Sequence, residues 1–266
     1  MHSLKSSLNT PMFAASSIVF QRMFTNADEF KKAKHIKCII QMSSLSNISP
    51  IVAELVKTAP TELCTIMDKH GSDKGLGWHN YTTVYTHIFD QLDFKNKSNV
   101  NIFEVGLGTN NINLPSNMGI NGKPGASLKG WSEYFQNANI FGADIDKDIL
   151  DAIRDEKNRI DTFYVDQCSA ETIRSMWVNP RLLDKKYDLF VDDGLHTFEA
   201  ASTLLRESHH VIKENGVYIV EDIHLYDIDK YLNMMPQYKE WFKHAEILVI
   251  PHATNTLHNN ILILQK

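Results

Sequence analysis

The chain has 266 residues, 43% of them hydrophobic and 22% charged, with a formal net charge of -5 at pH 7. This composition is ordinary for a globular protein and allows one α/β domain with an extension. The negative charge gives no general attraction to nucleic acid or anionic lipid, so nucleic acid is not expected as a partner. No apolar run approaches the roughly 20 residues that a membrane span requires.

The cysteines and the N-terminus indicate a cytoplasmic protein. Cys38, Cys64 and Cys168 are scattered, and no CxxC pair indicates a zinc site or a disulfide framework, so we expect reduced thiols. The weakly apolar segment 12–20 lacks the preceding basic region of a signal peptide.

Residues 1–60 are expected to form an N-terminal helical extension, ahead of a domain that covers residues 61–266. Helix-like patches at Ala27–Ile40 and Ile51–Val56 alternate with Ser- and Asn-rich stretches, and two prolines interrupt them. The extension carries no recognisable chemistry. It either packs on the domain or another subunit, or forms a partial lid over the active site.

The domain begins with a helical pattern that leads into a glycine-rich polar loop, HGSDKGLGWHNY, from His70 to Tyr81. Helical spacing of apolar residues resumes at Tyr81. The loop is either a simple turn or a ligand-binding segment, and Ser72 and Lys74 are its candidate contacts.

The remaining elements alternate between strand and helix and then end in a hairpin. Helices are expected at 127–135, 147–157, 169–177, 197–212 and 226–243, with Ser127 as a plausible N-cap. Strands are expected at 100–105, 139–143, 163–165, 187–191, 216–220, 246–250 and 260–264. The connection 251–259 is too short for a crossover helix, so the last two strands pair antiparallel. The pattern therefore predicts a Rossmann-like, mostly parallel seven-stranded sheet with an antiparallel last strand and helices on both faces.

Polar residues follow the first strand, where ligands bind in parallel α/β sheets. Glu104 precedes Gly106 and Gly108, glycines that allow a ligand to approach the backbone. The dinucleotide pattern GxGxxG would require a third glycine where Asn111 stands, so NAD binding is disfavoured.

The second and third strands also end in acids. Asp144 occupies the position that holds a ribose in Rossmann-like folds, whereas Asp146 is explained well as a helix cap. Asp166 and Gln167 either contact an adenine or are ordinary loop residues.

The fourth and fifth strands end in VDDGLH and VEDI, which carry Asp192, Asp193, Glu221 and Asp222 at one sheet edge, with His196 nearby. Such a cluster indicates a cation and a base, because carboxylate oxygens are suitable ligands for Mg²⁺. The alternative is helix capping plus surface acids, and Asp192 could serve only as a cap. The role of His224 stays open.

The order of these motifs resembles class I S-adenosylmethionine-dependent methyltransferases. GSDKG, WHNY, FEVGLG with GASLKGW, FGADID, and VDDGLH with VEDI are similar to the metal-dependent O-methyltransferases of macrolide sugars, of the mycinamicin and tylosin type. The resemblance covers roughly residues 61–266.

The resemblance implies a role for each matched residue. Asp193, Glu221 and Asp222 would bind a divalent cation, usually Mg²⁺, with His196 as the base and Asp193 beside it as a catalytic residue. The residues expected to contact S-adenosylmethionine are Ser72, Lys74, Glu104, Gly106, Gly108, Ser127, Asp144, Asp166, Gln167 and Asp192.

We therefore expect an O-methyltransferase that acts on a sugar hydroxyl, in a nucleotide sugar, glycoside or surface-polysaccharide precursor. A homo-oligomer is expected by the same resemblance. Two alternatives are an iron-dependent hydroxylase that uses His196, His224 and one carboxylate, and a noncatalytic nucleotide-binding protein.

Overall fold

The computed structural model of the chain describes residues 45, 48–57 and 60–266. The predicted helical patch at 27–40 and Cys38 lie outside the described residues, while Cys64 and Cys168 are free thiols. None of the described helices combines the length and the apolar character that crossing a membrane requires.

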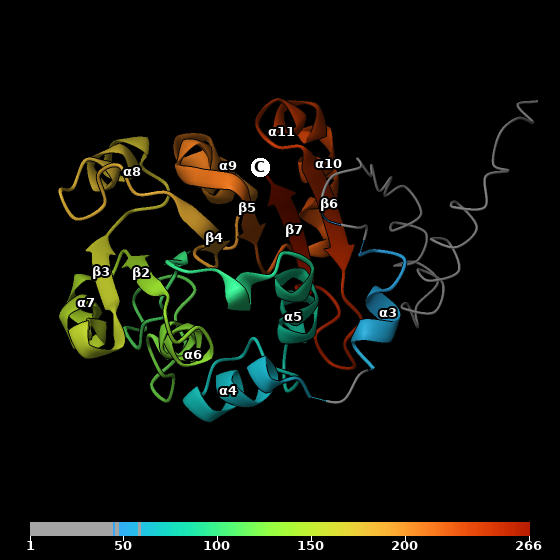
Figure 1. Ribbon diagram of the computed structural model, residues 1–266, viewed down its shortest axis with the longest axis horizontal. Coiled ribbons are helices and arrows are strands. Elements are labelled where there is room, and N and C mark those ends of the chain that lie inside the picture. The colour runs from blue at the N-terminus through green and yellow to red at the C-terminus, as the bar shows by residue number, and fades with distance from the viewer. Residues whose placement is uncertain (1–44, 46–47, 58–59) are drawn as a thin grey trace, which may run out of the picture.

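A single seven-stranded sheet forms the centre of the described part (Figure 1). Its strands are β1 (Asn101–Val105), β2 (Asn139–Asp144), β3 (Ile160–Tyr164), β4 (Tyr187–Asp192), β5 (Ile212–Val220), β6 (His244–Val249) and β7 (Asn260–Gln265). The order across the sheet is β3-β2-β1-β4-β5-β7-β6. Neighbours from β3 to β5 pair in parallel, and β7 pairs antiparallel with both β5 and β6. The predicted sheet and its terminal hairpin are confirmed.

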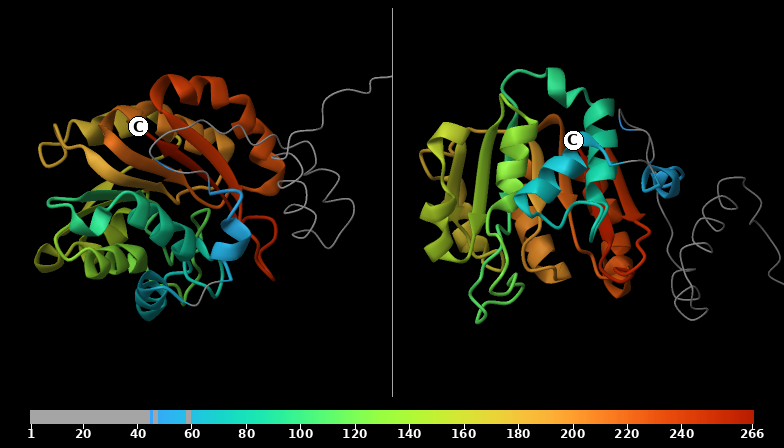
Figure 2. Two further views of the ribbon diagram at one scale, coloured as in Figure 1. Left: turned by 45° about the vertical axis from the view of Figure 1, so that its right-hand side comes forward. Right: turned by 90° about the horizontal axis from the view of Figure 1, so that it is seen from below.

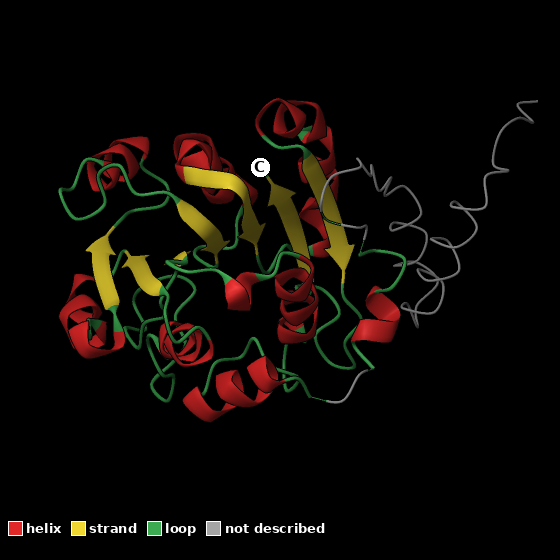
Figure 3. Ribbon diagram, viewed as in Figure 1, coloured by secondary structure: helices red, strands yellow, loops and turns green. Residues whose placement is uncertain are grey.

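Helices cover both faces of the sheet, as Figures 1 and 3 show. One layer contains α4 (Glu62–His70), α5 (Tyr81–Gln91), α6 (Ala126–Tyr134) and α7 (Lys147–Ile153). The other contains α8 (Ala170–Trp177), α9 (Phe198–Ser208), α10 (Ile228–Asn233) and α11 (Met235–Trp241). The short α3 (Val52–Leu55) lies near β6 and α5. Turned views show the twisted sheet between the two helical layers (Figure 2).

Two apolar clusters hold these layers to the sheet, because successive strand residues point to opposite faces. Ile102 contributes to the cluster under α4–α7 and Phe103 to the cluster under α8–α11. Trp131 of α6 and Trp177 of α8 are among the largest side chains in these two cores. The packing leaves the carboxyl edge of the parallel strands to the loops that follow them.

Several local predictions were wrong. The predicted helix 197–212 is α-helical only to Ser208 and β5 already begins at Ile212, while β3 begins three residues before the predicted strand 163–165. The segment 226–243 is not one helix, because Pro236 has no N–H for a helix interior and instead occupies the first turn of α11. The predicted helix 147–157 ends at Ile153, where Arg154 adopts a non-helical conformation. Ser127 is not an N-cap, because α6 begins one residue earlier, after Gly125 in a left-handed conformation.

The described residues before α4 are fastened to β6 and β7. The carboxylate of Glu246 accepts hydrogen bonds from the backbone N–H of Ile48 at 3.0 Å and of Ser49 at 2.7 Å. The amide of Gln265 accepts one from the N–H of Leu45 at 3.2 Å. Strand side chains thus fix the chain as it enters the domain.

Candidate active site

A cavity of ≈ 670 Å³ opens at the carboxyl edge of the sheet. Its walls come from the loops after β1, β2, β3 and β4 and from the loop that follows α4. The strand order reverses direction between β1 and β4, and ligands bind at such a switch point in open α/β sheets. The cavity is large enough for a cofactor-sized ligand.

Two glycines shape the floor of this cavity after β1. Gly106 and Gly108 have φ of 90° and 77°, in the region that favours glycine. A Cβ at Gly106 would lie 2.0 Å from the backbone oxygen of Asp193, so only glycine allows the loops after β1 and β4 to approach this closely.

The acids after β1 and β2 differ in their surroundings. Asp144 lines the cavity and accepts hydrogen bonds from the N–H of Leu107 at 2.7 Å and of Asp146 at 2.8 Å. Asp146 caps α7, as expected, by accepting from the N–H of Asp148. Glu104 is fully buried behind the wall, where it accepts from the Ser127 hydroxyl at 2.6 Å and the Trp131 indole at 2.5 Å.

Gln167 and Asp192 link the loop after β3 to that after β4. The Gln167 amide donates to Asp192 at 2.5 Å and accepts from the N–H of Leu195 at 2.9 Å. Asp192 is buried, which raises its pKa to about 7, although hydrogen bonds from Gly194 and Gln167 oppose the shift. It does not cap α9, whose N-cap is Thr197.

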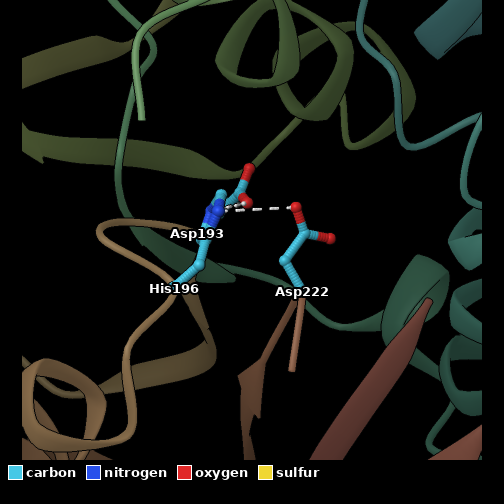
Figure 4. A group of neighbouring side chains, drawn as sticks. All are labelled: Asp193, His196 and Asp222. Carbon is cyan, nitrogen blue, oxygen red and sulfur yellow. Dashed lines mark hydrogen bonds and ion pairs between the residues drawn. The ribbon is translucent and has the colours of Figure 1, made fainter. Parts of the chain in front are cut away.

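Asp193, His196 and Asp222 meet at the end of the cavity (Figure 4). One potential ligand atom from each lies within 4.8 Å of the others. The His196 ring is 3.2 Å from an Asp193 oxygen and 3.6 Å from an Asp222 oxygen. His196 and Asp222 have φ of 59° and 52°, strained values for non-glycine residues that concentrate at functional sites.

The charges in this cluster act on one another. Burial lowers the pKa of His196, but its hydrogen bond to Asp193 and the charge of Asp222 overcome this and raise it to about 9. Burial raises the pKa of Asp193, yet Lys74 and His196 together hold it well below its usual value. The cluster therefore combines ionised carboxylates with a protonated imidazole, and another cation placed there would compete with that proton.

Glu221, a predicted metal ligand, lies deeper than Asp193 and Asp222 and is 1% exposed. Its two oxygens accept hydrogen bonds from the Tyr85 hydroxyl and the Lys74 ammonium group. Glu221 is thus near the other acids, as the strand ends predict, but it is engaged by protein groups on both oxygens.

Sequence reasoning did not identify the residues that hold these acids. The Tyr81 hydroxyl donates to Asp222 at 2.7 Å, and His79 lies 3.3 Å from the same oxygen. Tyr81 and Tyr85 are four residues apart on α5 and reach Asp222 and Glu221 respectively. The spacing of the two tyrosines indicated only the apolar face of a helix. Their hydroxyl groups, one helical turn apart, were the feature of the sequence that could have indicated partners for the acids.

The structure brings most of the expected cofactor residues to one cavity. Those in its wall are Ser72, Lys74, Gly106, Gly108, Ser127, Asp144, Asp166 and Gln167. Glu104 and Asp192 are behind the wall, bonded to residues that form it. His224 is not part of the acid and histidine cluster found among the described residues.

Three curated proteins are similar to this chain over part of its length. It is 28% identical over 176 residues to 8-demethyl-8-(2-methoxy-alpha-L-rhamnosyl)-tetracenomycin-C 3'-O-methyltransferase of Streptomyces olivaceus, covering 65% of this chain and 40% of the relative. It is 24% identical over 166 residues to demethylmacrocin O-methyltransferase of Streptomyces fradiae, covering 62% and 37%. It is 28% identical over 151 residues to mycinamicin VI 2''-O-methyltransferase of Micromonospora griseorubida, covering 54% and 32%. The chain thus matches less than half of each relative, and no family model matches it.

Solved structures identify the architecture. MycE methyltransferase from the mycinamycin biosynthetic pathway, in complex with Mg, SAH and mycinamycin VI, superimposes with a TM-score of 0.57 at 20% identity, over 77% of this chain and 54% of that one. A crystal of MycE with Mg and SAH gives 0.57 at 19% identity, over 78% and 55%. The chain shares its fold with MycE. This methyltransferase fold, with the curated relatives, confirms both the predicted fold class and the resemblance to sugar O-methyltransferases.

Proposed function

We propose that the chain is an S-adenosylmethionine-dependent and divalent-metal-dependent O-methyltransferase that acts on a sugar hydroxyl. The observation that carries the proposal is the position of Asp193, His196 and Asp222 at the end of the cavity at the sheet switch point. The three curated relatives are all named as O-methyltransferases, and two of the names specify a sugar position.

The residues of the cluster fit a hard divalent cation. Asp193 and Asp222 supply carboxylate oxygens, the ligand type that Mg²⁺ prefers, and are partly exposed at 21% and 13%. Glu221, expected as a third ligand, is not in this group of three, but it shares the partner Lys74 with Asp193. Both MycE complexes are titled as containing Mg, which supports the same ion here.

The cavity fits S-adenosylmethionine in a defined direction. Asp144 would accept hydrogen bonds from the ribose hydroxyls, Asp166 and Gln167 would border the adenine, and the Gly106 turn would approach the sulfonium group. Glu104 would act indirectly, because it orients Ser127 in the cavity wall.

The chain would carry out the reaction by positioning and by moving one proton. When bound, S-adenosylmethionine would supply the methyl group and the divalent cation would stabilise negative charge on the acceptor oxygen. The imidazole of His196 would lose its proton when the acids bind a divalent cation. A nitrogen of the neutral ring would then take the proton of the sugar hydroxyl, while Asp193 keeps the ring oriented. With the proton held by His196, the acceptor oxygen would be positioned to receive the methyl group, and S-adenosylhomocysteine would be the product that leaves.

The acceptor would enter beside Asp222, on the side away from Asp144. The Trp78 and Tyr226 side chains are 50% and 52% exposed. Trp78 is next to His79, which contacts Asp222, and Tyr226 follows Asp222 by four residues. Exposed aromatic rings with a polar edge are suited to the C–H faces and hydroxyls of a sugar ring.

The proposal includes a homo-oligomer with an N-terminal extension over residues 1–60, in the cytoplasm. The resemblance to sugar O-methyltransferases supports the oligomer, and the free thiols of Cys64 and Cys168 agree with a reducing compartment. Light scattering after size exclusion would measure the subunit number, and a monomer at micromolar concentration would contradict the expected oligomer.

The experiment that tests the function is methyl transfer from radiolabelled S-adenosylmethionine to a panel of nucleotide sugars and deoxysugar glycosides. We expect transfer with Mg²⁺ and its loss in EDTA, restored by added Mg²⁺. Transfer that is unaffected by EDTA would contradict metal dependence. Turnover that requires iron and O₂ instead would support the hydroxylase alternative, which no observation favours.

A further inference from the structure

Lys74 is a fully buried cation at the centre of the candidate site. It comes from the GSDKG loop, which leaves α4 through Gly71 in a left-handed conformation, and its side chain is 1% exposed. The ammonium nitrogen lies 2.6 Å from Asp193 and 3.5 Å from Glu104, and it also donates a hydrogen bond to Glu221. A lysine is almost never buried to this degree unless it is paired.

The three acids around Lys74 come from three strand ends. Glu104 belongs to β1, Asp193 follows β4 and Glu221 follows β5. Lys74 therefore ties together the same strand tips that form the candidate site. Neutral groups also donate hydrogen bonds to the two deepest acids. Ser127 and Trp131 donate to Glu104, and Tyr85 donates to Glu221.

The acids of the cluster share the Lys74 ammonium group. It contacts Asp193, Glu221 and Glu104, while Asp222 is joined to Asp193 through His196. Burial raises the pKa of Glu104 and Glu221, and the charge of Lys74 opposes this shift for both. Without Lys74, Asp193 and Glu221 would lose the cation that both contact.

We propose that Lys74 is a permanent internal cation of the site, which fixes Asp193 and Glu221 in place and lowers the attraction of these acids for a divalent cation. Lys74 is thus a positioning residue that also sets metal affinity. The identity of the cation rests on the function proposed above, whereas the pairing of Lys74 rests on geometry alone.

The test is to replace Lys74 with methionine, of similar length, and to measure Mg²⁺ and Mn²⁺ binding by calorimetry and thermal unfolding in EDTA. Removing a unit charge this close to two ligands should tighten divalent-cation binding about tenfold or more. The same change should lower the unfolding temperature in EDTA, because it leaves buried carboxylates unpaired. A change that only disordered the site would weaken metal binding instead.

A double variant, Lys74→Met with Glu221→Gln, keeps the test informative if the single variant fails to fold. It removes one charge of each sign, so it should regain most of the stability in EDTA and return metal affinity toward that of the wild type. The matched control is Lys69→Met, which removes an exposed lysine paired with Glu133 and should leave metal binding unchanged.

Two results would overturn the proposal: folded Lys74→Met that binds Mg²⁺ and Mn²⁺ no more tightly than wild type, or a double variant no more stable than the single one. These readouts do not depend on turnover. Absence of methyl transfer alongside the expected binding changes would therefore contradict the proposed function and leave the role of Lys74 standing.

Discussion

In the proposed site, Asp193 has two roles: it would bind the metal ion, and it would orient the base His196. Because Asp193 contacts Lys74 and His196, Asp193→Ala should remove turnover while leaving in place the residues after β1, β2 and β3 that are expected to bind the cofactor. We expect a loss of turnover of about 10³-fold, in the range for loss of a metal or oxyanion contact. Affinity for S-adenosylhomocysteine, measured by calorimetry, should change little. Asp151→Ala, on the exposed face of α7, is the control, and equal loss of cofactor affinity and activity would contradict the assignment.

Gly106 tests whether the close approach of two loops creates the cofactor cavity. An added methyl group would meet the Asp193 backbone 2.0 Å away and force a non-glycine residue to adopt φ of 90°. Gly106→Ala should therefore lower the free energy of unfolding by about 2 kcal/mol or more and weaken S-adenosylhomocysteine binding. Urea unfolding and calorimetry measure the two effects. A Cβ at Gly77, two residues after the GSDKG motif, would meet nothing within 4 Å, so Gly77→Ala should be close to neutral.

At the scale of elements, β6 fixes the segment before α4 through one carboxylate. Burial alone would raise the pKa of Glu246. Hydrogen bonds from His244 and from the N–H groups of Ile48 and Ser49 lower it by more, so the pKa is below the ordinary value. A depressed pKa in the folded state means that this stabilisation is present above the unfolded pKa and is lost as pH falls through the folded value.

Glu246→Ala should release these N–H groups and destabilise the fold by about 1.5–3 kcal/mol for each hydrogen bond to the charged group that is lost. Hydrogen exchange should become faster in residues 48–57, while β1 and β4 keep their protection. The difference in stability between wild type and variant should shrink as pH falls below the ordinary glutamate range. Glu240→Ala, at an exposed position of α11, is the control. Unchanged exchange at 48–57 in Glu246→Ala would show that other contacts hold the segment.

The strand tips were predictable from the sequence because apolar runs end abruptly in acids, and parallel strands place those ends at one edge. Asp193 and Asp222 were identified in this way. Helix ends were less predictable: no glycine or proline marks the end of α7 at Ile153, although Pro236 does mark the break between α10 and α11. The partners of the acids were not predictable at all: Lys74 and Tyr85 are 147 and 136 residues away from Glu221, and no local pattern encodes such pairings.

At the scale of the whole molecule, Asp222 would lie between the cavity and the proposed acceptor side with Trp78 and Tyr226, here called the aromatic side. Its Oδ2 atom faces His196 at the cavity end, and its Oδ1 atom faces Tyr81 and His79 on the aromatic side. The Tyr81 hydroxyl also donates to the backbone oxygen of His258, in the connection between β6 and β7. The terminal hairpin, absent from a purely parallel sheet, thus helps to position the acid that would separate donor from acceptor in the proposed reaction.

This division predicts that acceptor and cofactor affinities can be changed independently. Trp78→Ala and Tyr226→Ala should each raise the KM for the sugar acceptor about two- to tenfold, the equivalent of one lost aromatic contact of roughly 0.5–1.5 kcal/mol. The Kd for S-adenosylhomocysteine should stay the same, because neither side chain lines the cavity. Val178→Ala, an exposed apolar residue at the end of α8 and hence toward the opposite sheet edge, controls for loss of surface apolar area. An increase in cofactor Kd that matches the increase in acceptor KM would place both ligands on one side of Asp222, and unchanged acceptor KM in both variants would place the sugar elsewhere.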